Sequence, residues 1–360
     1  MIMEQYGVSK IICRADAKYP RHSEADVVRL TDGRLLLVWG RKTDGNDTSE
    51  GEIVGMFSSD GGVTWDDAPH VIRTPWAECR NAMSVSFCRT QRGLHLFYVG
   101  HDIVPPGEDV ERGMTTIYQS ISIDEGGSWS HPVAISFRNE FQVLNNARVI
   151  RTSAGRLLAP ISSVDGPIHE RYDFQRVFCL YSDDDGLTWA ESNQLEIVGV
   201  PLMEPGVAEC ADGSIYMTIR TKLGSLYEAR SYDGGATWGD LTSSGLPSAE
   251  APGTAFRDPK TGDLWMFWCN TPYTGHWYDR NDVAFAISRD NGRTWDDQVT
   301  LEHDDERSFG YISVTLVDAN VLLTYYDWKL DREKPNAGLF HMTELRQRII
   351  PRTDLVGVGC

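Results

Sequence analysis

The sequence has few cysteines, and none of them lie in a C-x-x-C spacing. Seven are scattered along the chain, and an odd count without pairs favours free or buried thiols in a reducing compartment. The N-terminus lacks the apolar segment of a secretory leader, and no stretch approaches the roughly 18 apolar residues of a membrane span. We therefore expect a soluble, cytoplasmic protein with no membrane partner.

Basic residues are also scarce. The chain has 34 Lys and Arg against 52 Asp and Glu, a formal net charge of −18. Such a surface repels nucleic acid, so we expect no nucleic-acid partner. An anionic ligand would need a local cluster of arginines. The nine histidines show no metal-ligand spacing and no phosphate loop or dinucleotide fingerprint is present, so we expect no metal and no cofactor. Nothing in the sequence indicates an oligomeric state.

What the chain has in plenty is a repeated turn. Five copies of S-x-D-x-G-x-[TS]-W, the Asp box, begin 49 to 64 residues apart, at Ser58, Ser122, Ser182, Ser231 and Ser288. In such a turn the Asp accepts hydrogen bonds from neighbouring backbone N–H groups, the Gly supplies a positive φ and the Trp packs the hairpin onto its neighbour. The motif is therefore structural, and its acidic residues do not indicate a calcium loop.

A second repeat interleaves with the first. Short turns, each between two strand-like runs, occur at residues 32–35, 92–94, 154–157, 212–215, 261–264 and 318–321. Each unit then contains four antiparallel strands, and six units predict an all-β, six-bladed β-propeller. We expect one domain over residues 1–360, a strand near Ser9 to Arg14 that closes the ring, and a loose tail over the last ten residues.

Charged residues gather where these strands would begin and end. Five of the six expected entrances of innermost strands carry Arg, Glu or both, and they would converge on one axis. The entrances hold Arg21 to Glu24, Arg80, Arg148, Glu204, Glu250 and Tyr311, and the exits of the second strands include Arg41, His101 and Arg220. Charged groups forced together need pairing or a charged ligand, so this end of the ring is the predicted site.

At these positions the chain resembles the sialidase superfamily over nearly its whole length. The segment beginning Glu204-Pro-Gly-Val, followed 16 residues later by Arg220, resembles the family segment with a catalytic base and an arginine of a triad. Arg280 resembles a second triad arginine. Tyr311 resembles the nucleophilic tyrosine, and Asp47 the acid/base aspartate. Asp44 competes with Asp47, because the length of that loop varies.

The first strand entrance departs from the family pattern. The expected register of the first triad arginine falls on Ser23, whereas Arg21 lies two residues earlier. A shift of two preserves the face of a strand and a bulge could absorb it, so Arg21 is our candidate. Four further residues at a similar height along their strands are candidates for substrate binding. The four are Arg41, Arg148, His22 and Glu24. Arg80 is another arginine at a similar height, without an assigned role.

The resemblance implies a retaining exo-glycosidase for a terminal sialic acid or a related 2-keto-sugar acid. A fork of guanidinium groups suits the sugar carboxylate, and a neutral phenol avoids the repulsion that a carboxylate nucleophile would meet. Two alternatives stay open. One is a propeller glycosidase or lyase for another acidic sugar, such as a uronic acid, with His22 or His101 as acid or base. The other is a glycan-binding propeller without catalysis.

Overall fold

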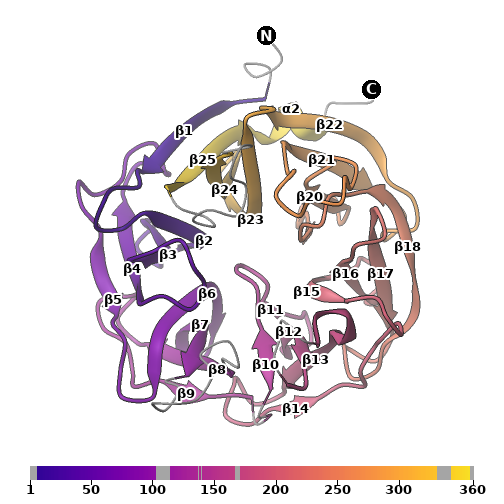
Figure 1. Cartoon of the computed structure of the whole chain (residues 1–360), viewed down its shortest axis with the longest axis horizontal. Helices are drawn as coiled ribbons and strands as arrows, with labels where there is room; N and C mark the ends of the chain where they lie inside the picture. The colour runs from indigo at the N-terminus through magenta and orange to yellow at the C-terminus, as the bar shows by residue number, and fades with distance from the viewer. Residues whose placement is uncertain are drawn as a thin grey trace.

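The computed structural model describes residues 6–102, 114–136, 138, 140–166, 171–330 and 342–356. In these ranges the elements are β-strands apart from a single 3-10 turn, Tyr172–Phe174, and one short helix, α2 (Arg352–Val356). The all-β class predicted from the sequence is confirmed. Figure 1 shows the sheets arranged in a ring around a central axis, with β2, β6, β15 and β23 near the centre.

The largest sheet has 12 strands. In spatial order it contains β23 (Arg307–Val317), β24 (Asn320–Lys329), β25 (Thr343–Pro351), β2 (Arg21–Arg29), β3 (Leu35–Lys42), β4 (Gly51–Ser58), β6 (Cys79–Thr90), β7 (Gly93–Asp102), β8 (Thr115–Ser122) and β9 (Val133–Ala134), with β1 (Val8–Cys13) on β25 and β5 (His70–Arg73) on β4. Two parallel contacts of one residue pair each, Arg21 with Thr343 and Gly51 with Asn81, connect groups that are otherwise antiparallel.

Three smaller antiparallel sheets complete the described fold. The first has five strands, β10 (Phe141–Val143), β11 (Ile150–Arg151), β12 (Leu157–Val164), β13 (Arg176–Ser182) and β14 (Ala190–Glu191). The second has β15 (Met203–Glu209), β16 (Ile215–Arg220), β17 (Ser225–Ser231) and β18 (Gly239–Pro247). The third has β19 (Thr254–Arg257), β20 (Leu264–Trp268), β21 (Asp282–Ser288) and β22 (Asp296–His303).

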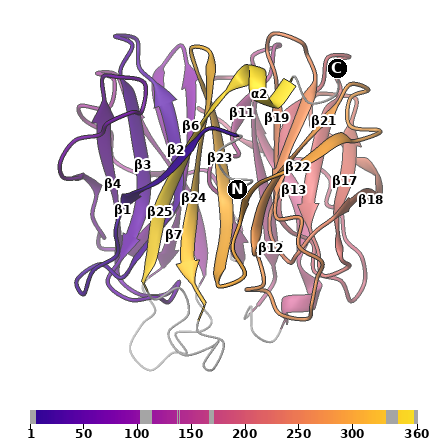
Figure 2. The same ribbon diagram turned by 90° about the horizontal axis from the view of Figure 1, so that it is seen from above.

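The six predicted hairpin turns each join an inner strand to the second strand of its group, and these predictions are confirmed. The sheets themselves are not closed, and one of them contains three of the hairpins. The count of six blades therefore stays a prediction. Figure 2 shows the strands running between the two ends of the ring.

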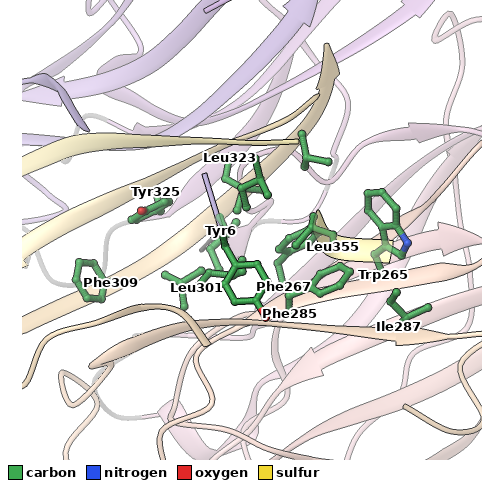
Figure 3. Packing of buried hydrophobic residues seen from close by; sticks show 14 residues of the cluster. Tyr6, Trp265, Phe267, Phe285, Ile287, Leu301, Phe309, Leu323, Tyr325 and Leu355 are labelled. Atoms are coloured by element: carbon green, nitrogen blue, oxygen red, sulfur yellow. The ribbon is translucent and has the colours of Figure 1, made fainter. Parts of the chain in front are cut away.

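Both ends of the described chain pack against the last strands. β1 pairs antiparallel with β25, from Val8 opposite Ile349 to Cys13 opposite Leu345, as the expected closing strand requires (Figure 2). The loose tail is corrected in part. Arg352 donates to Asp258 and Leu355 is fully buried, so the helix α2 is anchored. Figure 3 shows Leu355 and Tyr6 in one apolar cluster with aromatic residues of β20 and β21, including Phe267 and Phe285.

The Asp boxes make the predicted bonds in all five copies. In the first, Ser58 Oγ accepts from the backbone of Gly62 at 2.9 Å, and Asp60 accepts from the backbone of Thr64 at 2.8 Å. Hydrogen bonds from Thr64 and Ser58 lower the pKa of Asp60 to about 2. The same bonds recur in the turns that begin at Ser122, Ser182, Ser231 and Ser288. The acidic residues therefore act on their own turn.

Replacement of Ser58 by Ala is expected to lower the free energy of unfolding by about 1–3 kcal/mol, because the buried N–H of Gly62 loses its acceptor. Chemical denaturation followed by tryptophan fluorescence would measure the change. Ser59→Ala is the matched control, since Ser59 is the exposed neighbour in the same turn. Equal stability of the two variants would contradict the proposed role of the bond.

The six described cysteines are free thiols, as expected, and five of them are buried. Burial raises the pKa of Cys79, Cys88 and Cys269 to about 12. A raised pKa leaves little thiolate at pH 8. In a Cys360→Ser variant we expect Ellman's reagent to titrate less than about one thiol rapidly in the native protein and all six in denaturant. Rapid labelling of several native thiols would refute this.

Candidate active site

Backbone bulges mark the beginnings of the innermost strands. The pairings of β2 with β3, β6 with β7, β15 with β16 and β23 with β24 each shift register there. At these shifts four non-glycine residues adopt positive φ angles, namely Glu24 (63°), Ser84 (57°), Glu204 (42°) and Tyr311 (58°). This conformation costs an L-residue roughly 1–2 kcal/mol, and such strain clusters at functional sites. Three of the four are predicted site residues.

Tyr311 and Glu204 form a direct pair. Oη of Tyr311 donates a hydrogen bond of 2.7 Å to Oε1 of Glu204. Burial and the negative charge of Glu204 raise the pKa of Tyr311 well above its ordinary value, while Arg280 and Arg220 act in the opposite direction. The backbone oxygen of Tyr311 accepts a 3.0 Å bond from Asn146. The phenol is therefore neutral and lies beside a carboxylate that can accept its proton.

Arg220 bridges two glutamates. Its Nη1 donates to Glu204 at 2.6 Å and its Nη2 to Glu250 at 3.0 Å. The hydroxyl of Tyr172 also donates to Glu250, so a second tyrosine–glutamate pair lies on the other side of the guanidinium. Arg220 and Glu250 are both buried. Arg220 therefore holds Oε2 of Glu204, while Oε1 accepts the hydrogen bond from Tyr311.

Arg280 is 1% exposed and its donors reach neutral oxygens. Nε and Nη2 donate to the backbone oxygen of Glu250 at 3.1 and 2.6 Å, and Nη1 donates to the hydroxyl of Tyr326 at 2.9 Å. The guanidinium lies 5.7 Å from the ring centroid of Tyr311. No carboxylate in the described chain forms a direct ion pair with Arg280, so its charge is available to an anionic ligand.

Arg21, the candidate for the first triad arginine, lies next to Asp47. Its Nη1 lies 2.7 Å from Oδ1 of Asp47, and its Nη2 lies 3.3 Å from Oε1 of Glu24. The predicted bulge follows Ser23, and Nε of Arg21 donates to Ser23 Oγ at 3.3 Å, so the two lie on one face. Ser84 donates to Glu24 from the neighbouring strand. Burial raises the pKa of Glu24, against the effect of Arg21.

The loop that carries Asp47 rests on two buried residues. Lys42 donates to the backbone oxygen of Asp47 at 2.8 Å and lies 3.6 Å from its carboxylate. Asn81 donates to the backbone oxygens of Asp47 and Ser49, each at 2.7 Å. The side chain of Asp47 stays 55% exposed. Asp44, the competing candidate, instead accepts from the backbone of Gly45 within its own turn.

Two candidate residues lie away from this cluster. Arg41 pairs with Glu52 at 2.6 Å and stacks on the ring of Tyr19. His22 accepts a 3.0 Å bond from the indole of Trp39. The register explains both positions, because Arg21 lies opposite Lys42 while His22 lies opposite Arg41 on the alternate face. The expectation that Arg41 and His22 face the axis with Arg21 is therefore corrected.

Arg148 lies among the inner strands beside the Tyr311–Glu204 pair. Its Nη1 donates to the backbone oxygens of Asn146 and Ile312, while Nε and Nη2 have no hydrogen-bond partner among the described residues. Burial lowers its pKa to about 10, and Glu204 is the largest of the charges that oppose this shift. Arg148 therefore adds a second buried cation that no carboxylate pairs directly.

Sequence reasoning missed several members of the cluster. Glu250 was seen only as charge at a strand entrance, and Tyr172 and Lys42 were not singled out. Lys42 carries the clearest signal, since it lies directly opposite Arg21 once the β2–β3 hairpin is in register. Tyr172 is the first residue of the 3-10 turn and has no such signal.

Within the described ranges, no helix has the length and apolar character needed to cross a bilayer. In those same ranges no three His, Cys, Asp or Glu side chains are grouped so that they could hold a metal ion. The Tyr311–Glu204 pair and Asp47 offer nucleophilic and acid–base groups beside arginines, which is chemistry suited to a small anionic substrate.

The family model described as BNR repeat-like domain matches residues 33–322. The chain belongs to this family, within the sialidase superfamily. The matched range contains all five Asp boxes, and it also contains Glu204 and Tyr311.

Among curated proteins, this BNR-family chain is similar to the anhydrosialidase of Macrobdella decora, at 29% identity over 165 residues, which is 40% of this chain and 21% of that protein. It is also similar to a sialidase of Bacteroides fragilis (strain YCH46), at 26% identity over 235 residues, 62% of this chain and 41% of that protein. The chain thus spans less than half the length of these relatives.

Solved structures share the fold at low identity. A leech intramolecular trans-sialidase complexed with 2,7-anhydro-Neu5Ac superimposes with a TM-score of 0.75 at 16% identity, over 98% of this chain and 71% of that one. Trypanosoma rangeli sialidase gives 0.70 at 16%, over 94% and 56%. A protein of unknown function from Dyadobacter fermentans gives 0.74 at 19%, over 95% and 99%. These similarities support a sialidase-like, all-β fold.

Proposed function

We propose that the protein is an exo-glycosidase of sialidase type that releases a terminal sialic acid or a related 2-keto-sugar acid with retention of configuration. The observation that carries the proposal is the 2.7 Å hydrogen bond from Tyr311 to Glu204, flanked by buried arginines. A binding module has no need of a tyrosine paired with a base. The names of the curated relatives, a sialidase and an anhydrosialidase, support the same class of chemistry.

In this proposal Tyr311 attacks the anomeric carbon and Glu204 accepts its proton. The anomeric carbon of a sialic acid bears a carboxylate, which a neutral phenol approaches without the repulsion that an anionic nucleophile would meet. Arg21, Arg220 and Arg280 bind the sugar carboxylate by charge-assisted hydrogen bonds. Arg280 contributes most to the attraction, because its donors otherwise contact only neutral oxygens.

Asp47 acts as the acid that protonates the leaving oxygen and then as the base that activates water. Its position at the exposed end of the Arg21 ion pair supports this role. The uronic-acid alternative receives less support, because His22 is bonded to Trp39 rather than turned towards Tyr311. Burial also lowers the pKa of His101 to about 3, which keeps it neutral.

We also propose that the ring that carries this site has six blades. Each of the six confirmed hairpins begins one group of antiparallel strands, and the 12-stranded sheet is joined only by two single parallel pairs. We count that sheet as three blades. In a six-bladed ring the entrances that hold Glu24, Glu204 and Tyr311 would surround one axis, as the mechanism requires.

The test uses proton NMR to follow the hydrolysis of a panel of glycosides of sialic acids, related 2-keto-sugar acids and uronic acids. We expect release of the sugar from α-glycosides of N-acetylneuraminic acid or of a related 2-keto-sugar acid, with the α-anomer appearing first. Formation of a 2,7-anhydro sugar instead would still agree with a tyrosine nucleophile, and the product would resemble the 2,7-anhydro-Neu5Ac bound in the leech trans-sialidase structure. Turnover of uronic acid glycosides alone, or binding without turnover of any member, would refute the proposal.

A further inference from the structure

A cavity of about 570 Å³ lies beside the loop that carries Asp47. Its walls include Thr48, Ser49 and Glu50 from this loop, Trp76 from the segment that leads into β6, and Arg80 from the start of β6. The volume falls in the range of small-molecule sites, roughly 300–1,000 Å³. None of these five residues belongs to the tyrosine–arginine cluster.

The cavity and the acid/base residue share one rigid support. Nη1 of Arg80 donates to the backbone oxygen of Thr48 at 3.2 Å. The next residue, Asn81, donates to the backbone oxygens on either side of Thr48, at Asp47 and Ser49. The wall of the cavity therefore begins at the residue that follows Asp47 and is held in a fixed relation to its carboxylate.

We propose that this cavity, the Trp76 cavity, binds the leaving group of the substrate, a neutral hexose. The inference rests on the proposed function. A general acid must lie within hydrogen-bond reach of the oxygen it protonates, so the leaving group extends from the anomeric carbon on the side of Asp47. The arginines hold the sugar acid, and the cavity is an open pocket whose wall begins at Thr48, the residue after Asp47.

The lining suits a sugar ring. Trp76 is half-buried and lies edge-on to Tyr98 and Tyr118, with ring centroids 6.2 and 5.1 Å away. Paired backbone bonds of 3.0 and 2.9 Å between Trp76 and Cys79 fix the turn that presents it. A rigid indole face provides apolar contact for the C–H face of a hexose.

The polar groups of the Trp76 cavity balance in charge. Glu50 is exposed and supplies acceptors, and Arg80 is half-buried and supplies donors. One carboxylate and one guanidinium favour a neutral polyol over a second acidic sugar. Thr48 and Ser49 add polar residues to the wall that follows Asp47 in the chain.

The experiment compares kcat/KM for two α-glycosides of the same sugar acid, one with lactose and one with methanol as leaving group. In Trp76→Ala we expect the ratio of lactoside to methyl glycoside to fall about tenfold, the loss typical of a buried aromatic contact. Glu50→Gln changes an exposed side chain with little risk to folding and should lower the ratio in the same direction. Glu78→Gln is the matched control, an exposed carboxylate in the same segment outside the cavity.

Lactose binding separates this inference from the proposed function. Calorimetric titration should show saturable binding to the wild type and to Tyr311→Phe, and weaker binding to Trp76→Ala and Glu50→Gln. A protein that cleaves neither glycoside yet binds lactose through Trp76 would refute the proposed function and retain the cavity as a hexose site. An unchanged ratio in both variants, or no saturable lactose binding to the wild type, would overturn the inference.

Discussion

Replacement of Tyr311 by Phe is expected to reduce kcat by roughly 10³-fold or more, as removal of a nucleophile does in other enzymes. The change deletes one oxygen, so the ring still packs 5.7 Å from Arg280 and the arginines keep their positions. The Kd for the free sugar acid should therefore change little. Single-turnover kinetics and calorimetry would measure the two quantities separately.

Tyr325→Phe is the matched control. Tyr325 also donates a 2.7 Å hydrogen bond to a glutamate, Glu302, but this glutamate is bound by Arg348 and Ser9 rather than by Arg220. Its loss should cost stability and leave kcat within a small factor of the wild type. Full activity in Tyr311→Phe would refute the nucleophile assignment, and equal losses in both variants would show that only folding was measured.

The parts of the fold that the sequence predicts are those governed by local hydrogen bonds. In the Asp box that begins at Ser58, the bonds join residues two to four positions apart. Local bonds of this kind depend on residue type alone, so the motif predicts its own geometry. The tail was less predictable, because burial of Leu355 depends on β20 and β21, many positions earlier in the chain.

The site was predictable only where a motif carries the residue. The Tyr311–Glu204 pair was inferred through resemblance to a family, since nothing local joins residues 107 positions apart. Glu250 contacts Arg220, Tyr172 contacts Glu250, and both come from segments outside the strands that no periodicity connects to Arg220. The positive φ angles at Glu204 and Tyr311 were also hidden, because neither position is glycine.

The error at Arg41 has a simple physical origin. Counting from a turn gives the height of a residue along a strand but not its face, and one position of register moves a side chain to the opposite side. Arg41 and Lys42 differ by that one position. Lys42 reaches Asp47, whereas Arg41 reaches Glu52.

Replacement of Asp47 by Asn is expected to lower kcat/KM for alkyl and sugar glycosides by about 10²–10⁴-fold, the usual contribution of a general acid. A 4-nitrophenyl glycoside needs little protonation of its leaving oxygen and should lose much less. The difference between the two substrates is the readout. Asp44→Asn is the control on the same loop, because Asp44 bonds only within its own turn in the described structure.

The charge around Asp47 adds a test by pH. Desolvation by its neighbours would raise the pKa of Asp47, but the charges of Arg21 and Lys42 outweigh this effect and hold the pKa well below the ordinary carboxyl range. Glu24 is the opposing anion on β2, and Asn81 on β6 contributes only a neutral amide. The free protein therefore holds an ionised Asp47, which cannot yet donate a proton. Because this pKa is lowered by folding, the pair stabilises the protein above the carboxyl pKa of about 3.9, and that stability is lost as the pH falls.

A substrate carboxylate that binds Arg21 competes with Asp47 for the same guanidinium and adds a negative charge nearby, and both effects raise the pKa of Asp47. Binding of N-acetylneuraminic acid near pH 6 should therefore be accompanied by proton uptake. Calorimetry in buffers of different ionisation enthalpy measures this uptake, which should disappear in Asp47→Asn and persist in Asp44→Asn. Binding with no dependence on the buffer would show that Arg21 keeps its ion pair when the sugar acid is bound, and Asp47 would then lack the proton that the proposed mechanism requires.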